Sequence, residues 1–598
     1  MFDGRIYRAA FVPLLFVLVI AGFSLASQPA PLGSTLAPDA FNGTRAFASL
    51  QTLTRRFPDR RPGSAGDNEL AGYVAHALQE LGGSAGGGFQ VTTHTLRAQT
   101  IDGARTLTTV VAERPGSTGM SPIAVVAHRD AVGRSSAAEL SGTAALLELA
   151  RVFSQSETRR TIVLVSTSGG SGGDAGATDF AQHGTHPLDA AIVLGDLAGA
   201  LARKPLVLPF SEDSETAPES LQRTLDTAIS QEGGTNPGAL SASAQFAHLA
   251  FPLATGEEAP LNAAGVPAVL VQVSGERPPS PVEPVSPTRL LNFGRAALSA
   301  TYALDEGPDV SRGSAPHLLL GRKMLPGWAV RLLAFALLLP PLLVSVDAFA
   351  RLRRRREPVL RWVAWALTGA LPFFTCALFA ILLGRFGVVA APAGQLSAGS
   401  LSADGSGAGA VVSVALVLVL ALLAWPALAR RLALPLRPSA DGAALAVMLV
   451  LLGVSLFAWV FNPFACLLLV PALHVWLLAV GAGRQAGMRA RALALAGIIV
   501  GVLPLALLLA IYGRELGLGP GGLSESAVLA LVGGQLGPFA ALMWSVTFGC
   551  VVAVLLLAPP SESVAGAGPE EWVEISTRGP ASYAGPGSLG GTESALRR

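Results

Sequence analysis

The chain has 598 residues, of which 51% are hydrophobic and 14% are charged. Soluble globular proteins carry about 25% charged residues, so this composition excludes an ordinary soluble enzyme. The 42 Lys and Arg residues nearly balance the 40 Asp and Glu residues, which excludes a nucleic-acid-binding chain and a wholly disordered one. The composition therefore predicts a protein embedded in a lipid bilayer.

The first apolar segment lies near the N-terminus. Residues 9–26 form an uncharged run that is just long enough to cross a hydrocarbon core of about 30 Å as a helix. Arg5 and Arg8 lie in the preceding residues 1–8, and basic residues favour the cytoplasmic side. Because further apolar runs follow, we expect a retained transmembrane anchor. The small residues of SLASQPAP leave a cleaved signal peptide as the alternative.

Seven more apolar runs follow in the second half of the chain. They cover 328–350, 359–384, 410–429, 443–462, 464–482, 492–512 and 527–557. Arginines gather after the second, fourth and sixth of the eight runs, in loops that face the cytoplasm if the N-terminus does. The last run contains GGQLGP and could be a short re-entrant piece followed by one span. The expected count is therefore seven to nine spans, about seven of them in a helical membrane domain over 328–557.

These runs predict a topology for the remaining segments. Residues 39–310 form a polar block outside the cytoplasm, and both termini lie inside it. The block contains no cysteine, which suits the outer face of a bacterial plasma membrane. The tail 559–598 is rich in Gly, Ser and Pro and is expected to be disordered. The lipid bilayer is the expected partner, with other membrane proteins as further candidates.

Helices and short β-branched runs alternate through the outer block. Helices are expected over 68–81, 141–153 and 218–231, and strands over 106–113, 123–128, 161–167, 190–196 and 266–273. This alternation predicts an α/β fold, a mixed sheet flanked by helices. Functional sites in such sheets gather at the carboxyl ends of strands, where His128, Asp130 and Asp196 lie.

Five stretches of the outer block resemble the M28 family of zinc exopeptidases. They are RPGSAGDNELAGYVAHALQELG (61–82), AHRDA (127–131), SGTAALLELAR (141–151), VLGDLAG (193–199) and AAGVPAVLV (263–271). They occur in the family's order over nearly all of 45–305, and they imply the M28 fold for this block. An M28-like domain between one anchor and a multi-span bundle is also similar in plan to the Gaa1-type subunit of the GPI transamidase.

The resemblance implies roles for three residues. The M28 site binds two zinc ions through five side chains and uses a glutamate as general base. His128 corresponds to the first histidine ligand, Asp130 to the aspartate that orients it, and Asp196 to a later carboxylate ligand.

The other positions of the family site are occupied by different residues. The bridging aspartate falls on Ala138, the paired glutamates fall on Gly or Ser within 166–176, and the last histidine falls on Glu258. Two ligands and no base are too few for the family's zinc chemistry. The resemblance therefore implies a degenerate site with no catalytic residue and no bound cofactor. The glycine-rich stretch 169–176 lacks the Lys-Ser/Thr of a phosphate-binding loop and predicts a flexible loop.

A rebuilt metal site is the alternative. Glu139 adjoins the bridging position, and with His128, Asp196 and Glu258 it would supply one nitrogen and three carboxylates. Such hard ligands suit Mg²⁺, Mn²⁺ or Ca²⁺ better than Zn²⁺. Glu139 and Glu258 could instead be solvated loop carboxylates, and His128 and Asp130 a structural hydrogen-bonded pair.

Two functions follow from these alternatives. The first is a non-catalytic receptor, scaffold or assembly subunit whose outer cleft binds a peptide or a lipid-linked head group. The second is an active membrane-anchored metallo-exopeptidase, an M28-like aminopeptidase, with a rebuilt metal site and Glu257 or Glu258 as base. Stoichiometric metal in the cleft distinguishes them, because only the enzyme needs it.

Overall fold

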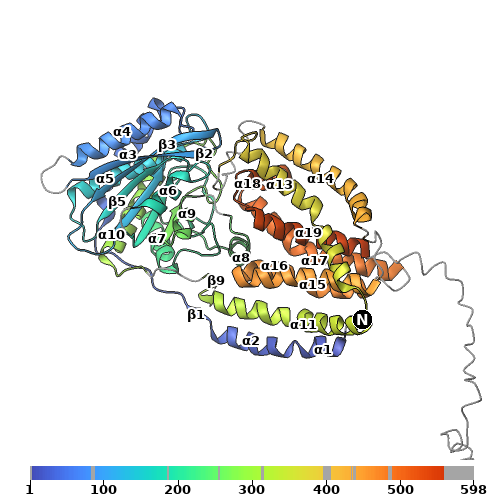
Figure 1. The fold of residues 1–598 in the computed structure, drawn as a ribbon. Coiled ribbons are helices and arrows are strands. Elements are labelled where there is room, and N and C mark those ends of the chain that lie inside the picture. The colour runs from blue at the N-terminus through green and yellow to red at the C-terminus, as the bar shows by residue number, and fades with distance from the viewer. Residues whose placement is uncertain are drawn as a thin grey trace, which may run out of the picture.

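A computed structural model describes residues 3–82, 88–184, 187–253, 256–310, 316–392, 394, 406–432, 434, 440–482 and 488–557. An α/β domain lies on one side and a bundle of long helices on the other (Figure 1). The predicted tail 559–598 lies outside the described residues.

The α/β domain contains a seven-stranded sheet with the order β2-β3-β5-β4-β6-β8-β7. Its strands are β2 (Gln90–Thr100), β3 (Gly103–Arg114), β4 (Ile123–His128), β5 (Ile162–Thr167), β6 (Ala190–Leu194), β7 (Val207–Leu208) and β8 (Ala268–Val271). The four central strands, β5, β4, β6 and β8, run parallel, whereas β2, β3 and β7 pair antiparallel with their neighbours. The predicted mixed sheet is therefore confirmed.

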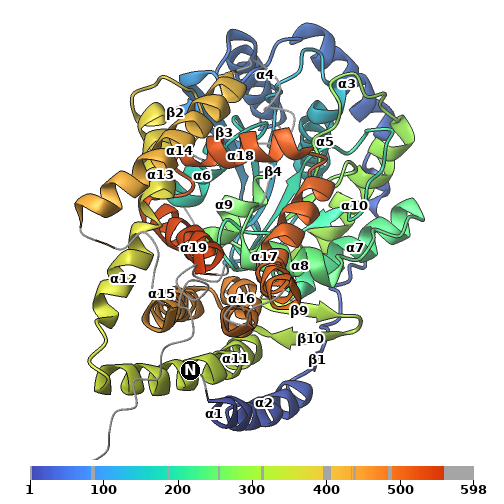
Figure 2. The same cartoon turned by 90° about the vertical axis from the view of Figure 1, so that its right-hand side faces the viewer.

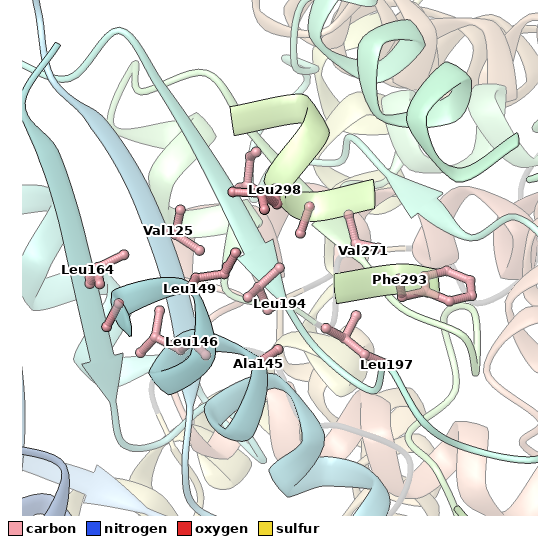
Figure 3. Close-up of a cluster of buried hydrophobic side chains, with 14 of the residues drawn as sticks. Val125, Ala145, Leu146, Leu149, Leu164, Leu194, Leu197, Val271, Phe293 and Leu298 are labelled. Carbon is pink, nitrogen blue, oxygen red and sulfur yellow. The ribbon is translucent and has the colours of Figure 1, made fainter. Parts of the chain in front are cut away.

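Helices cover both faces of this sheet. They are α3 (Gly43–Arg56), α4 (Ala65–Gly82), α5 (Ala137–Gln155), α6 (Ala175–His183), α7 (Glu219–Gly233), α8 (Ala242–Ala250), α9 (Glu258–Ala263) and α10 (Pro287–Glu306), preceded by a short turn of 3-10 helix, η1 (Pro38–Ala40). Successive strand side chains point to opposite faces, so Val125 packs into the core under α5 and α10 (Figure 3), while Val126 packs into a second core with α6 and α9.

The expected elements fall on observed ones, with one shift that affects the site. The five predicted strands lie on β3, β4, β5, β6 and β8, and the three predicted helices lie on α4, α5 and α7. Helix α5 begins at Ala137, four residues before the predicted start, because Ser136 holds the extended backbone of an N-cap. Glu139 is thereby placed in the first turn of α5.

The second part of the chain is helical. It consists of α11 (Gly327–Arg354), α12 (Val359–Thr368), α13 (Leu371–Arg385), α14 (Ser406–Arg431), α15 (Ala440–Phe461), α16 (Pro463–Ala482), α17 (Met488–Glu515), α18 (Pro520–Val532) and α19 (Pro538–Leu557). Within the described ranges, seven helices are long and apolar enough to cross a membrane, counting Gly4–Phe23 and Val359–Arg385 as one each.

The last predicted run, 527–557, does not form one helix. Helix α18 ends at Val532, and α19 begins at Pro538 after the glycine-containing segment. With 13 residues, α18 is about 20 Å long and is too short to cross a core of about 30 Å. The structure of this region therefore agrees with the alternative prediction, in which a short helical piece is followed by one span.

The N-terminal segment is attached to the helical part at both ends. Helices α1 (Gly4–Ala9) and α2 (Val12–Phe23) pack along α11, and the Tyr7 hydroxyl lies 2.6 Å from Nδ1 of His474. Beyond α2, β1 (Ala26–Ser27) pairs antiparallel with β10 (Lys323–Pro326), which pairs with β9 (His317–Leu320). These are the contacts that a retained anchor would make, and the anchor itself stays a prediction.

The strand pairing of β1 provides a test of this anchor. Ala26 and Met324 are directly opposed, so an Ala26→Cys/Met324→Cys chain is expected to form an intramolecular disulfide on mild oxidation, detected by peptide mass spectrometry. Ala26→Cys/Leu319→Cys is the control, because Leu319 lies one strand further away, about 10 Å from Ala26. The three native cysteines are buried. A mature chain that begins after Ser27 would contradict the prediction.

Candidate functional site

The carboxyl ends of the central strands line a small cavity. His128 ends β4, Asp196 follows β6 by two residues, and Gln272 directly follows β8, and all three side chains line the same space. Parallel strands place their carboxyl ends at one edge, which is why these residues meet. The cavity has a volume of about 30 Å³, enough for one water-sized group.

The wall of the cavity is strongly acidic. One imidazole and four carboxyl groups line it: His128, Glu139, Asp196, Glu257 and Glu276. Glu139 Oε2, Asp196 Oδ2 and Glu257 Oε2 are buried and have no hydrogen-bond partner in the described part of the chain. Burying a carboxylate oxygen without a partner is unfavourable, so these atoms mark where a donor or a cation would be stabilised.

Burial controls the protonation of Glu139 and Asp196. It raises the pKa of Glu139 to about 7, and the positive charge of a protonated His128 opposes this effect. It raises the pKa of Asp196 to about 6, although Oδ1 accepts hydrogen bonds from the N–H groups of Ala198 (3.0 Å) and Gly199 (2.7 Å). Both carboxyl groups therefore change charge near neutral pH.

Glu257 is the carboxyl group that approaches the histidine. Its Oε2 lies 3.9 Å from Nδ1 of His128, and its Oε1 accepts a hydrogen bond from the Thr167 hydroxyl at the end of β5. Burial also raises the pKa of Glu257. Thr167 of β5, the strand beside β4, thus holds Glu257 next to His128.

Glu258 is buried but does not line the cavity. It is 1% exposed and Glu139 is 8% exposed, so neither is the solvated loop carboxylate considered as an alternative. Glu258 Oε2 packs so closely on the backbone of Gly256 that a Cβ there would lie 2.2 Å away. Burial raises the pKa of Glu258 well above its usual value. Of the expected replacement ligands, Glu139 is therefore in the cavity and Glu258 is outside it.

Asp130 binds the glycine-rich loop. Its Oδ1 accepts the N–H groups of Gly169 (2.9 Å) and Gly170 (3.1 Å), and its Oδ2 accepts the N–H (2.9 Å) and the hydroxyl of Ser171. The loop is thus fixed around a buried carboxylate, and its φ of +97° at Gly169 favours glycine. In the residues the structure covers, no hydrogen bond joins Asp130 to the His128 ring, the partner that the resemblance implies.

These residues do not fit a pair of zinc ions. A Cβ on Gly170 would lie 2.5 Å from Cβ of His128, so this backbone has no room for a carboxylate at one position implied for the glutamates. Ala138 is fully buried and offers no ligand atom. Among the described residues, no group of three or more His, Cys, Asp or Glu is placed to hold a metal ion, whereas zinc needs three or four protein ligands.

Glu276 is the acidic lining residue that the sequence analysis did not identify. It lies five residues beyond β8, and both its oxygens are 3.2 Å from Nε2 of His248 on α8. The rule that singled out Asp196, a carboxylate just past a strand end, applies equally to the predicted strand 266–273 and Glu276.

A family model matches part of the α/β domain. Residues 109–269 match the family model described as Peptidase family M28. A glutaminyl cyclase from Bacteroides thetaiotaomicron bound to N-acetylhistamine is 16% identical, with a TM-score of 0.35, over 44% of this chain and 98% of that one.

Two exopeptidase structures are similar to the same degree. A leucine aminopeptidase precursor from Bacteroides thetaiotaomicron is 16% identical over 45% of this chain and 99% of its own, with a TM-score of 0.36. A Zn-dependent exopeptidase from Parabacteroides distasonis is 16% identical over 44% and 98%, with a TM-score of 0.35. No curated protein matches.

Proposed function

We propose that the chain, whose α/β domain is of the M28 peptidase type, is a membrane-anchored binding protein that holds a small cationic group without hydrolysing a peptide. The observation that carries this proposal is the cavity at the strand ends. Four carboxyl groups and one imidazole line it, and within the described residues three of its buried carboxylate oxygens lack partners and no Lys or Arg is among the lining residues. A cation of the size of one water molecule would satisfy those oxygens.

Two features of the cavity support binding without hydrolysis. Peptide hydrolysis needs a base to activate water and an electrophile that polarises the carbonyl. Glu257 is the carboxyl group nearest His128, but one of its oxygens already accepts the Thr167 hydroxyl. Among the described lining residues, no cationic side chain beyond His128 is present to stabilise an oxyanion.

A metallo-exopeptidase with a rebuilt site is the second candidate. It is supported by the lining of one cavity by His128, Glu139 and Asp196, whose side chains carry the oxygen and nitrogen atoms that bind hard divalent ions such as Mn²⁺, Mg²⁺ or Ca²⁺. Because no such group is placed to hold a metal ion among the described residues, these side chains would have to move closer together when the ion binds. Because their pKa values are raised, Glu139 and Asp196 would have to lose protons when a metal binds.

Elemental analysis and ethanolamine binding test the proposal together. The purified full chain is dialysed against each divalent metal, then assayed for ions and for release of amino acids from short peptides. We expect less than about a tenth of an ion per chain, no release, and a higher melting temperature with ethanolamine. That increase should disappear in Glu139→Gln and persist in Glu69→Gln, an exposed control. One or more ions per chain with metal-dependent release would establish the second candidate instead.

A further inference from the structure

Two walls of the cavity lie against the helical part of the chain. Gly170 and Ser171 line one wall, and in the same loop a Cβ on Gly173 would lie 2.3 Å from Pro392, which follows α13. On another wall, Glu276 is followed by Arg277, whose Nε donates to the carbonyl of Glu515 at 3.1 Å. The cavity therefore lies between two contacts with the bundle.

The contacts of Arg277 show which end of α17 lies beside the cavity. Arg277 also donates to the carbonyl of Arg514, so its guanidinium caps the C-terminal end of α17, where the helix dipole is negative. The uncharged apolar run 492–512 of α17 has 21 residues, about 30 Å of helix, which matches the hydrocarbon core of a bilayer. Arg514 and Glu515, just beyond this run, are then at the level of the lipid headgroups, and so is the cavity wall beside them.

The packing of α8 holds this placement. Ala247 and Leu249 of α8 share a buried apolar cluster with Phe464 of α16 and Leu508 of α17. The Tyr512 hydroxyl donates to the carbonyl of Phe251 at 2.6 Å, and the Asn462 amide donates to the carbonyl of Leu249 at 2.8 Å. Figure 2, seen from the bundle, shows α17, α18 and α19 in front of the α/β domain, with α8 and α9 behind them. These contacts hold the side of the α/β domain that contains the cavity against the helical bundle.

Both signs of charge occur around the cavity. Glu139, Asp196 and Glu257 line it with carboxyl groups. At the contact with α17, the lining Glu276 has both its oxygens 3.2 Å from Nε2 of His248, and Arg277, which follows Glu276 and does not itself line the cavity, lies next to the exposed Arg514. A ligand that fits these charges has a positive group among the three carboxyl groups and a negative group beside Arg277. The volume of about 30 Å³ suits a primary ammonium, whereas a trimethylammonium group is larger.

We propose that the bound cation is the primary ammonium of a phospholipid headgroup, which enters the cavity from the bilayer and leaves its phosphate beside Arg277. This inference rests on the proposed function, because it names the source of the cation. A peptide N-terminus has the same ammonium but no phosphate at the matching position. The juxtaposition of the acidic cavity, Arg277 and the end of α17 favours the lipid.

Native mass spectrometry of the full chain tests the lipid. The chain is released from detergent after incubation with phosphatidylethanolamine, phosphatidylcholine or phosphatidylglycerol of identical acyl chains. We expect one phosphatidylethanolamine to be retained at least about tenfold better than the others, because charge-assisted hydrogen bonds are lost with either substitute. Glu139→Gln/Glu257→Gln should reduce its retention to that of phosphatidylcholine. Glu69→Gln/Glu80→Gln, two exposed positions on α4, should leave it unchanged.

The Arg277→Gln variant tests the phosphate contact separately from the ammonium contact. It should weaken phosphatidylethanolamine retention while free ethanolamine still raises the melting temperature, which also shows that the variant is folded. Equal retention of the three lipids by the unaltered chain would overturn the lipid proposal. If ethanolamine still stabilised that chain through Glu139, the proposed function would stand, and a short peptide with a free N-terminus would be its ligand. If neither ethanolamine nor any lipid bound, both proposals would fail.

Discussion

Replacing Arg129 by methionine is expected to lower the free energy of unfolding of the α/β domain by about 3–5 kcal/mol, the usual loss when one partner of a buried ion pair is removed. Arg129 is 0% exposed, and its Nε lies 2.9 Å from Oδ1 of Asp67. Its Nη1 also donates to the carbonyls of Ser166 (3.1 Å) and Thr167 (2.9 Å) at the end of β5. The substitution would remove these side-chain donors from the buried carbonyls, although the Thr167 carbonyl would keep the backbone N–H of residue 129 (3.2 Å).

Asp67 explains why this loss is large. Burial raises the pKa of its carboxyl group, and the charge of Arg129 is the largest opposing influence. Without Arg129, the chain must bury either an unpaired charge or a carboxyl group that has taken up a proton.

Pulse proteolysis of the full chain in urea would measure this loss, since the described tryptophans lie in the helical part and do not report on the α/β domain. Arg134→Met is the matched control, because Arg134 is exposed, and it should change the unfolding free energy by less than about 0.5 kcal/mol. In Asp67→Asn/Arg129→Met part of the stability should return. A loss below about 1 kcal/mol in the single variant would contradict the assigned role.

Glu139→Gln is expected to stabilise the α/β domain at pH 8 by roughly 3 kcal/mol and to have little effect at pH 4.5. The pKa of this carboxyl group is about 7 in the folded chain, against 4.5 as the ordinary value. A carboxyl group with a raised pKa favours folding in its protonated form. Its ionisation therefore removes stability as the pH rises from about 4.5 to about 7, and the loss is constant above that range. Glutamine resembles the protonated acid at every pH.

Melting temperatures of the two chains between pH 4.5 and 8 would test this dependence. The exposed control Glu69→Gln should give a curve parallel to that of the unaltered chain. Ethanolamine should reduce the difference between Glu139→Gln and the unaltered chain at pH 8, because a cation stabilises the ionised carboxylate. A pH-independent difference would show that the gain arises from packing and not from the ionisation of Glu139.

The sequence alone determined the class of the protein and much of its fold. The apolar runs predict the long helices because a hydrocarbon core requires about 20 apolar residues, whatever the rest of the chain does. Strands β4, β5, β6 and β8 were recognisable because parallel strands are covered on both faces and therefore read as continuous β-branched runs. His128 and Asp196 could be placed near each other because they lie at the carboxyl ends of two neighbouring parallel strands.

Only the tertiary structure decided which carboxyl groups meet His128. Glu257 and Glu258 are adjacent, but Glu257 precedes the first turn of α9 and faces the cavity, whereas Glu258 begins that helix and packs on Gly256. Asp130 is bound to the loop at Gly169 by backbone N–H groups that no sequence pattern reveals. The contact of Arg277 with α17 joins residues more than 230 positions apart. Side-chain direction and long-range packing depend on the whole fold, whereas hydropathy and strand patterns are local.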